Sequence, residues 1–404
     1  MIRRSGVLFL LPAVLLAACG EAAGHSTATV TDSAGVQIVT STAPAWAEGE
    51  TWTIDTAPEL DIGGSDTDPH YDLLDVSGVT RFHDGRIAVL SAGSSQLMIY
   101  DSAGAWMSSH GRAGEGPGEF RAPGKLFHLP GDTLGTFDYQ LRRVSRFGPD
   151  GTFLSSLSTA QTAGGKFVVP NARLDDGSWL ARAASGFTPD SKPGATRPLE
   201  LLVRLTPDLG PEADTVATVL GSESWVVSGG SGKDRFATIW GVPLGPSSAY
   251  TAHDSLIYVG DNVRYGISVL RPDGSLVRSI RRAGEPPPVT DDMLARVKAD
   301  FLEDVPPEQL AEQTAIWDNF PRHERMPAYD DFTVDPDGNL WVMRARVLRS
   351  DPATADIFDS SGRLLGAVAL PANFTPFEIG SDYLLGIWRD EMDLQHVRMY
   401  SIRK

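Results

Sequence analysis

Short apolar runs alternate with polar turns along most of this chain, and strands and turns recur in the same order. Turns of the Asp-Gly type join a first strand to a second, such as 86–90, 178–182 or 339–344. These first turns lie at 83–85, 130–132, 175–177, 252–254, 336–338 and 380–382. A second set, at 101–104, 149–151, 207–210, 272–274 and 359–362, separates a third strand from a fourth. The pattern therefore predicts repeated four-stranded antiparallel units.

Six such units can be counted, and evenly repeated units of this kind form one ring-shaped domain rather than several domains. We therefore expect an all-β, six-bladed β-propeller over residues 35–404. The last unit lacks a fourth strand, because the chain ends close to its third strand, 395–402. Residues 51–62 have the pattern of an outer strand, and we expect them to complete that unit and close the ring. Residues 36–40 should form a further edge strand on the same unit.

One link departs from the repeat. Residues 288–321 contain apolar positions at helical spacing, including Met293, Val297 and Phe301, and Thr290 can cap the helix start. A second helix should carry Leu310 and Trp317. We expect this short helical insertion between the fourth and fifth units to emerge on the face opposite the hairpin turns. It serves either as a packed cover for a blade edge or as a lid over the channel mouth.

The first 18 residues have the features of a bacterial signal peptide. Arg3 and Arg4 precede the apolar run 7–18, which is too short to span a bilayer as a helix. The sequence Leu-Ala-Ala-Cys at 16–19 resembles the lipobox of bacterial lipoproteins, which implies that the Cys19 thiol receives a lipid. The alternative is an ordinary signal peptide whose cleavage site precedes a cysteine. Residues 19–34 are expected to be a flexible tether.

Net charge and cysteine content limit the classes of partner that this chain can have. The formal net charge is −17, which argues against a nucleic-acid partner and favours a body that stands off an anionic membrane surface. Cys19 is the single cysteine, so no intramolecular disulfide can form. We expect a monomer tethered to the membrane through lipid on Cys19.

The second unit carries the most specific motif. GPGEFRAP at 116–123 is followed by Asp-Tyr-Gln at 138–140, by RRVSRF at 142–147 and by Gly-Pro-Asp-Gly at 148–151. This unit resembles an NHL repeat, and the chain from Cys19 onward is similar to bacterial six-bladed β-propeller lipoproteins. The resemblance implies a propeller fold and a location in the cell envelope, at the outer membrane or the periplasmic face. It implies no particular activity.

Polar residues gather in the links opposite the hairpin turns. The sequence Arg-Ala-Gly-Glu occurs at 112–115 and again at the equivalent link 282–285, so these residues should lie on one rim. Arginine binds carboxylate and phosphate groups in a bidentate manner, although ion pairs between neighbouring blades explain the same residues equally well. The candidate ligand-binding residues are Arg112, Glu115, Asp138, Arg142, Asp261, Arg264, Arg282, Glu285, Arg344 and Arg389.

Metal and nucleophile signatures are weak. The eight histidines are scattered, with no pair at ligand spacing on one element, so the sequence predicts no metal site and no cofactor. Acidic residues crowd one link and could bind calcium, although their spacing matches no defined loop: Asp66, Asp68, Asp72 and Asp75.

Two functions of different classes remain open. The first is a binding module for a peptide, protein or anionic glycan in the envelope. The second is a lyase or hydrolase that acts on an anionic sugar or peptide at the central face, and the sequence identifies no catalytic residue for it.

Overall fold

The protein is built almost entirely of antiparallel sheet. The computed structural model describes residues 27–65, 67–159, 166–184, 191–210 and 213–404. The predicted signal peptide and Cys19 lie outside these residues, as does Asp66. Among the described helices, none is long and apolar enough to cross a membrane.

Sheets of consecutive strands follow one another along the chain. The first two contain β5 (Val76–Arg81), β6 (Ile87–Ser91), β7 (Gln96–Tyr100) and β8 (Trp106–His110), then β9 (Pro123–Leu129), β10 (Thr133–Asp138), β11 (Arg143–Phe147) and β12 (Phe153–Ser158). The short 3₁₀ turn η1 (Pro130–Asp132) joins β9 to β10. The next sheet contains β13 (Phe167–Arg173), β14 (Trp179–Ala184), β16 (Leu199–Leu205) and β17 (Ala213–Leu220).

The second half of the chain continues the same arrangement. One sheet contains β20 (Ser248–His253), β21 (Leu256–Asp261), β22 (Gly266–Leu270) and β23 (Leu276–Arg282). Another contains β24 (Asp331–Val334), β25 (Leu340–Met343), β26 (Thr354–Phe358) and β27 (Leu364–Ala369), and the last contains β28 (Phe374–Ile379), β29 (Tyr383–Arg389) and β30 (Gln395–Arg403). The four-strand periodicity predicted from the turns is therefore present.

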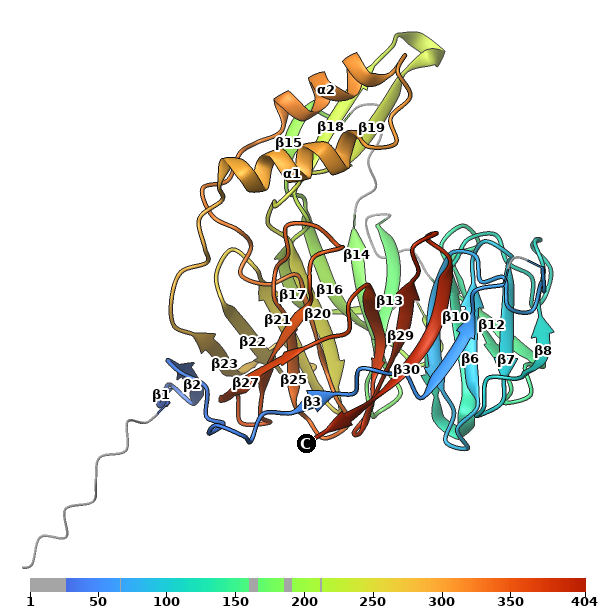
Figure 1. Cartoon of the computed structure of the whole chain (residues 1–404), viewed down its shortest axis with the longest axis horizontal. Coiled ribbons are helices and arrows are strands. Elements are labelled where there is room, and N and C mark those ends of the chain that lie inside the picture. The colour runs from blue at the N-terminus through green and yellow to red at the C-terminus, as the bar shows by residue number, and fades with distance from the viewer. Residues whose placement is uncertain (1–26, 66, 160–165, 185–190, 211–212) are drawn as a thin grey trace, which may run out of the picture.

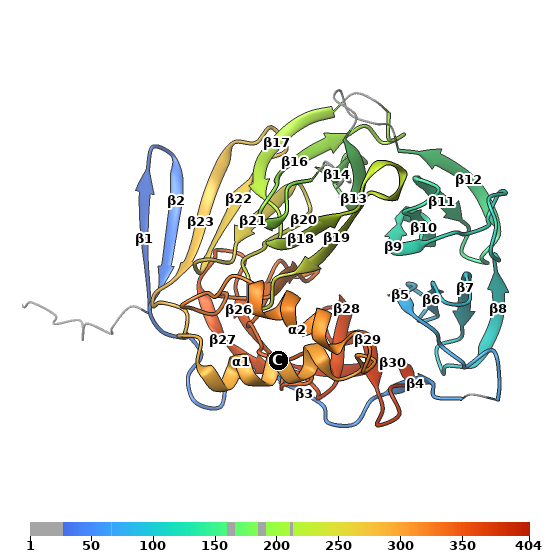
Figure 2. The same ribbon diagram turned by 90° about the horizontal axis from the view of Figure 1, so that it is seen from above.

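The sheets lie around a common centre, as the view from above shows (Figure 2). Strand β5 contacts β9 and β28, and β20 contacts β13 and β24, so the first strand of each of these sheets faces inward. Apolar clusters fill the spaces between neighbouring sheets; one of them joins Ile62 and Val89 to Leu385. Propeller packing of this kind leaves only the first strands to line the centre.

The N-terminal segment completes the last sheet. Strand β4 (Leu60–Gly63) pairs antiparallel with β30, as does the two-residue strand β3 (Thr53–Ile54). Leu60 and Ile62 of β4 are buried, whereas Asp61 between them is exposed. The alternation of apolar and polar residues thus matches a strand that is covered on one face. The predicted pairing of residues 51–62 with the last unit is confirmed.

Two other N-terminal expectations need correction. Strand β2 (Val36–Ser41) is present, but it pairs in parallel with β23 rather than with the last sheet. Strand β1 (Ala28–Ser33) then pairs with β2, so the tether expected over 19–34 does not extend through 28–33. Residues 42–50 lead from this edge towards β3. A local pattern identifies a strand, but it does not specify which distant edge the strand joins.

The predicted helical insertion is present, and it packs on a sheet that the sequence analysis missed. Helix α1 (Asp291–Leu302) begins at Thr290, whose Oγ1 accepts a hydrogen bond from Met293 N, and α2 (Leu310–Asn319) follows. The missed sheet contains β15 (Gly194–Thr196), β18 (Ser224–Gly229) and β19 (Phe236–Gly241), with the 3₁₀ turn η2 (Gly232–Asp234) between the last two. Figure 1 shows helices and sheet together as a separate layer above the ring.

An aromatic cluster holds this upper layer together. Val297, Ile316, Trp317 and Phe320 of the helical insertion are buried, and Trp225, Trp240 and Phe301 pack against them. Carboxylate Glu223, at the base of β18, lies 2.6 Å from His323 Nε2, which follows the helices. The insertion is therefore packed through its apolar face, as its helical periodicity requires.

Candidate functional site

 The first strands of the sheets enclose a central cavity of about 540 Å³. Residues of β5, β9, β13, β20, β24 and β28 line the central cavity, so it is the channel that runs through the ring. A volume of this size is typical of a pocket for a small ligand.

Lys125 is the most informative residue in this channel. It lies on β9, and its Nζ donates a hydrogen bond to Asn171 Oδ1 of β13 at 2.7 Å. Burial, together with a smaller effect of the nearby Arg182 guanidinium, lowers the pKa of Lys125 to about 8, although Asp331 acts in the opposite direction. The ammonium group is therefore poorly compensated by the protein around it.

Two neighbouring carboxyl groups enter the same channel from β24 and the residue before it. The Asp331 side chain is exposed to the channel, but the channel itself is surrounded by protein. This environment raises the pKa of Asp331, whereas the nearby Lys125 lowers it. Burial likewise raises the pKa of Asp330 to about 6, against the opposing effect of Arg346. Carboxyl groups with raised pKa values beside an amine with a lowered one are characteristic of functional sites.

Tyrosine side chains complete the polar surface around Lys125. Burial raises the pKa of Tyr250 on β20 to about 12, and its phenol interacts with Asn171. Gly124 lies beside the Tyr139 ring, where an added Cβ would lie 2.1 Å from a ring carbon. The glycine therefore lets the aromatic ring lie directly against β9. A larger residue there would displace the ring from β9.

Four of the predicted ligand-binding residues line an outer cavity of about 840 Å³: Asp261, Arg264, Arg282 and Glu285. Thr40 of β2 and Leu220 of β17 also line this cavity. Within it, Asp261 Oδ2 lies 3.2 Å from Arg197 Nη1, so part of its charge is already paired. These four residues therefore lie together, whereas the sequence predicted all ten candidates on a single rim.

The two Arg-Ala-Gly-Glu links do not share an opening. Arg112 lines a different, shallow cavity of about 330 Å³, where it pairs with Glu119 at 2.7 Å. Glu115 pairs with Arg121 at 2.8 Å. The expectation of one rim is wrong because each link follows the outermost strand of its sheet, and outermost strands lie far apart around a ring.

The remaining predicted residues are mostly structural. Asp138 is buried, and its carboxylate accepts hydrogen bonds from four backbone amides, so it holds a turn and does not face a ligand. Arg142 lies over the Phe167 ring, with Cζ 5.1 Å from the ring centroid. Arg389 pairs with the exposed Asp393 at 3.1 Å. Arg344 alone among the ten lines the central channel.

In the acidic link that was predicted as a possible calcium site, Asp68 stabilises a turn. Asp68 Oδ1 accepts a hydrogen bond from His70 N at 2.9 Å, which is the geometry of a turn. Asp66 lies outside the described residues, so the arrangement of the full set stays a sequence prediction.

Sequence reasoning missed Lys125, Asn171, Tyr250 and Asp331, although a signal was present. Each lies in a first strand, a few residues before a hairpin turn that the sequence analysis did identify. Polar residues on strands that line the centre of a ring are exposed to the channel rather than to the core. Because loops commonly carry function, the sequence pattern favoured the links over these strands as candidate sites.

No family model matches this chain, and no curated protein matches it. Solved structures do resemble it. A member of the DUF4221 family from Bacteroides vulgatus is 12% identical, with a TM-score of 0.54, and the match covers 87% of this chain and 99% of that one. An exported protein from Bacteroides fragilis is 13% identical, with a TM-score of 0.48 and coverage of 91% and 99%.

A gluconolactonase from Xanthomonas campestris is 14% identical, with a TM-score of 0.45, and the match covers 87% of this chain and all of that one. These structures are β-propeller folds. At such low identity the likeness concerns the fold alone. This chain has a propeller-like arrangement of four-stranded sheets, and an NHL family is not confirmed.

Proposed function

We propose that this protein is an envelope lipoprotein with a six-bladed, NHL-like propeller whose central channel binds an anionic ligand. The ligand class is a peptide or glycan that carries a carboxylate or phosphate group. A lipid on Cys19 would hold the protein at the membrane, and the negatively charged body would stand away from anionic lipids.

One observation carries the ligand proposal. Lys125 lies inside the channel, and its burial lowers its pKa, which means that the protein does not fully compensate its positive charge. A bound anion would supply the missing compensation. Asn171 and Tyr250 on adjoining strands, and Arg344 from β25–β26, offer further hydrogen-bond donors around the same cavity.

We expect Lys125→Met to weaken binding of the best ligand by about 10- to 150-fold, which corresponds to about 1.5–3 kcal/mol for a charge-assisted hydrogen bond. Muropeptides, uronic-acid oligosaccharides and short acidic peptides would be screened by thermal shift, and the affinity of each hit measured by calorimetry. Lys298→Met is the matched control, since Lys298 lies on α1 and pairs with Asp318 on the surface. Equal affinity in both variants would place the ligand elsewhere.

Binding should also depend on pH in a defined direction. Lys125 has a pKa of about 8 in the free protein, so its protonated fraction falls about tenfold for each pH unit well above that value. Affinity for an anion should therefore fall as the pH rises through 8. Lys125→Arg should remove this dependence between pH 8 and 10, because arginine stays protonated.

A catalytic role is the second candidate, and the same channel favours it. An amine with a lowered pKa beside Asp331, whose pKa is raised, has the chemistry of an acid and base pair for a lyase or hydrolase. Mass spectrometry of each screened ligand after incubation would separate the two functions. Unchanged ligand supports the binding module, and a product that disappears in Lys125→Met supports the enzyme.

Membrane tethering is tested through Cys19. We expect Cys19→Ala to move the protein from the membrane fraction to the soluble envelope fraction, because the acylated thiol is the proposed anchor. Fractionation with metabolic palmitate labelling measures this. Thr31→Ala, which alters only the exposed surface of β1, should stay in the membrane fraction and keep the label. Retention and labelling of the Cys19 variant would overturn the assignment.

A further inference from the structure

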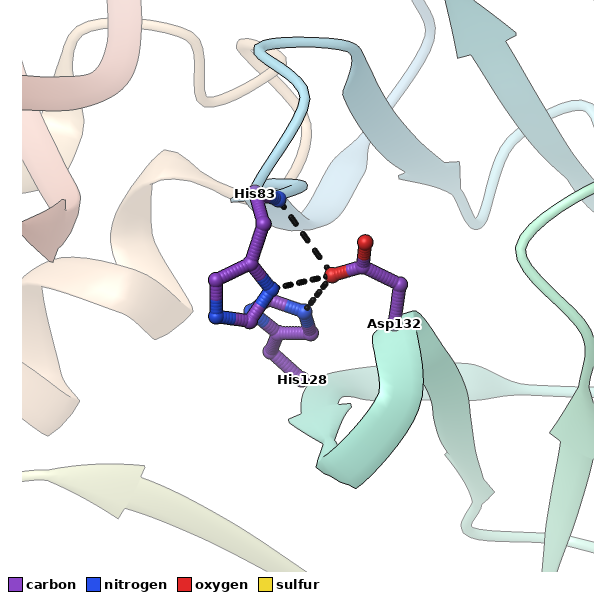
Figure 3. A group of neighbouring side chains, drawn as sticks. All are labelled: His83, His128 and Asp132. Carbon is purple, nitrogen blue, oxygen red and sulfur yellow. Dashed lines mark hydrogen bonds and ion pairs between the residues drawn. The ribbon is translucent and has the colours of Figure 1, made fainter.

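Two histidines and an aspartate from two neighbouring sheets lie close together (Figure 3). His83 lies in the turn between β5 and β6, His128 on β9, and Asp132 in η1. His83 Nδ1 lies 2.6 Å from Asp132 Oδ1, and His128 Nε2 lies 2.8 Å from the same oxygen. One potential ligand atom from each residue lies within 4.8 Å of the other two.

These three groups have the chemistry of a transition-metal site. Imidazole nitrogens and a carboxylate oxygen are common ligands of Zn²⁺, Co²⁺ and Ni²⁺, whereas Ca²⁺ and Mg²⁺ prefer oxygen alone. Ligand atoms about 2.0–2.1 Å from a tetrahedral ion lie about 3.3 Å apart. The two short contacts to Asp132 Oδ1 would therefore need to open by roughly 0.5–0.7 Å, which side-chain rotation can supply.

Asp132 lies in a tight turn and directs its carboxylate at both histidines. Its backbone has φ 54°, in the left-handed region that aspartate tolerates better than most residues, and Gly131 before it has φ 72°. This tight turn directs the carboxylate back towards His128, four residues earlier.

A cavity leaves room for further ligands. His83 and His128 line a pocket of about 380 Å³ together with Arg81, Glu378 and Tyr383. Glu378 accepts hydrogen bonds from the hydroxyl groups of Thr80 and Tyr383, so its carboxylate is engaged within the pocket wall. Ile379 lines both this pocket and the central channel, so the cluster lies at the end of the channel where the hairpin turns are.

We propose that His83, His128 and Asp132 bind one divalent transition-metal ion, with its remaining coordination position open to this pocket. The ion would replace the imidazole protons that now bridge to Asp132. Because His83 belongs to the β5–β8 sheet and the other two residues to the β9–β12 sheet, the ion would also link neighbouring blades. Bound metal should therefore raise the melting temperature as well as occupy a ligand site.

The test uses the full chain, expressed without a histidine tag, purified in detergent and stripped with EDTA. Co²⁺ is titrated while its visible absorption is recorded, because tetrahedral cobalt absorbs much more strongly than the hydrated ion, and Zn²⁺ binding is measured by calorimetry. We expect one ion per chain and a higher melting temperature with Zn²⁺. His128→Gln and Asp132→Asn should each weaken Zn²⁺ binding at least tenfold.

His253→Gln is the matched control. His253 also ends a first strand beside an aspartate, with Nε2 3.4 Å from Asp254 Oδ2, but the described residues around it form no group of three potential ligands. This variant should bind Zn²⁺ as the unmodified protein does. Circular dichroism without metal checks that each variant is folded, and two independent substitutions guard against a local folding defect.

Several results would overturn the proposal. They are an absence of Zn²⁺ binding at 100 times the protein concentration, equal affinity in the unmodified chain and both variants, or an equal loss in His253→Gln. An octahedral Co²⁺ spectrum that does not change in His128→Gln would likewise show that the ion binds elsewhere. The measurement is independent of the channel ligand, so it stands whether or not Lys125 binds an anion.

Discussion

Replacing Leu60 and Ile62 with aspartate is expected to prevent stable folding. Both side chains are buried on β4, the strand that joins the N-terminal segment to β30 at the end of the chain. Burial of each apolar side chain contributes about 1.5–3 kcal/mol, and an unpaired carboxylate in the same place adds several kcal/mol of desolvation cost. The combined loss is comparable to the about 5–15 kcal/mol that stabilises a typical protein.

Size-exclusion chromatography and thermal melting would measure this effect. We expect the double variant to aggregate, because loss of β4 leaves the edge of β30 unpaired. Val30→Asp is the matched control: Val30 lies on β1, at the outer edge of another sheet, and is 53% exposed. A sharp, unshifted melting transition for the double variant would contradict the proposal that the N-terminal strand closes the ring.

Local features of this fold were predictable from the sequence. Gly85 and Gly338 each complete a predicted hairpin turn with φ above 80°, a conformation that glycine adopts without strain. Thr290 caps α1 as expected, since the cap depends only on residues within one helical turn. Turns and caps are set by neighbouring residues, so a single sequence carries enough information to find them.

Features that depend on distant pairing were predicted less well. Strand β2 was recognised, but its parallel pairing with β23 was not, because residues 36–41 present a similar edge to any sheet. The β18–β19 hairpin was missed, since Trp225 and Trp240 are covered only in part, by α1 and α2 of the helical insertion. Burial by an element about 50 or more residues away leaves no local periodic signal.

The candidate site, too, was predictable only in its local features. The Arg-Ala-Gly-Glu links were visible as a repeated motif, yet repetition of a motif does not show where it lies along the radius of a ring. Lys125 and Asp331 have no shared motif; what joins them is the channel between their strands. Arg282 and Arg344 were both predicted as ligand-binding residues; they line different cavities, and both pair with the buried Asp356.

Asp356→Asn is expected to lower the free energy of unfolding by about 3 kcal/mol. The fully buried carboxylate accepts hydrogen bonds from Arg282 Nη1 and Arg344 Nη2, each at 2.6 Å, and from the Tyr265 hydroxyl at 2.8 Å. Loss of one partner from a buried pair typically costs about 3–5 kcal/mol. We take the lower end, because both guanidinium groups are partly exposed.

Urea denaturation of Asp356→Asn and of the control Asp393→Asn would measure the difference. Asp393 forms an exposed ion pair with Arg389, and exposed pairs contribute little to stability. The control should therefore unfold at the same urea concentration as the unmodified protein. The same substitution should weaken ligand binding in the channel, because Asp356 fixes Arg344, which lines it. A destabilisation below about 1 kcal/mol would show that the two arginines find other compensation and that Asp356 does not organise the wall between the outer cavity and the channel.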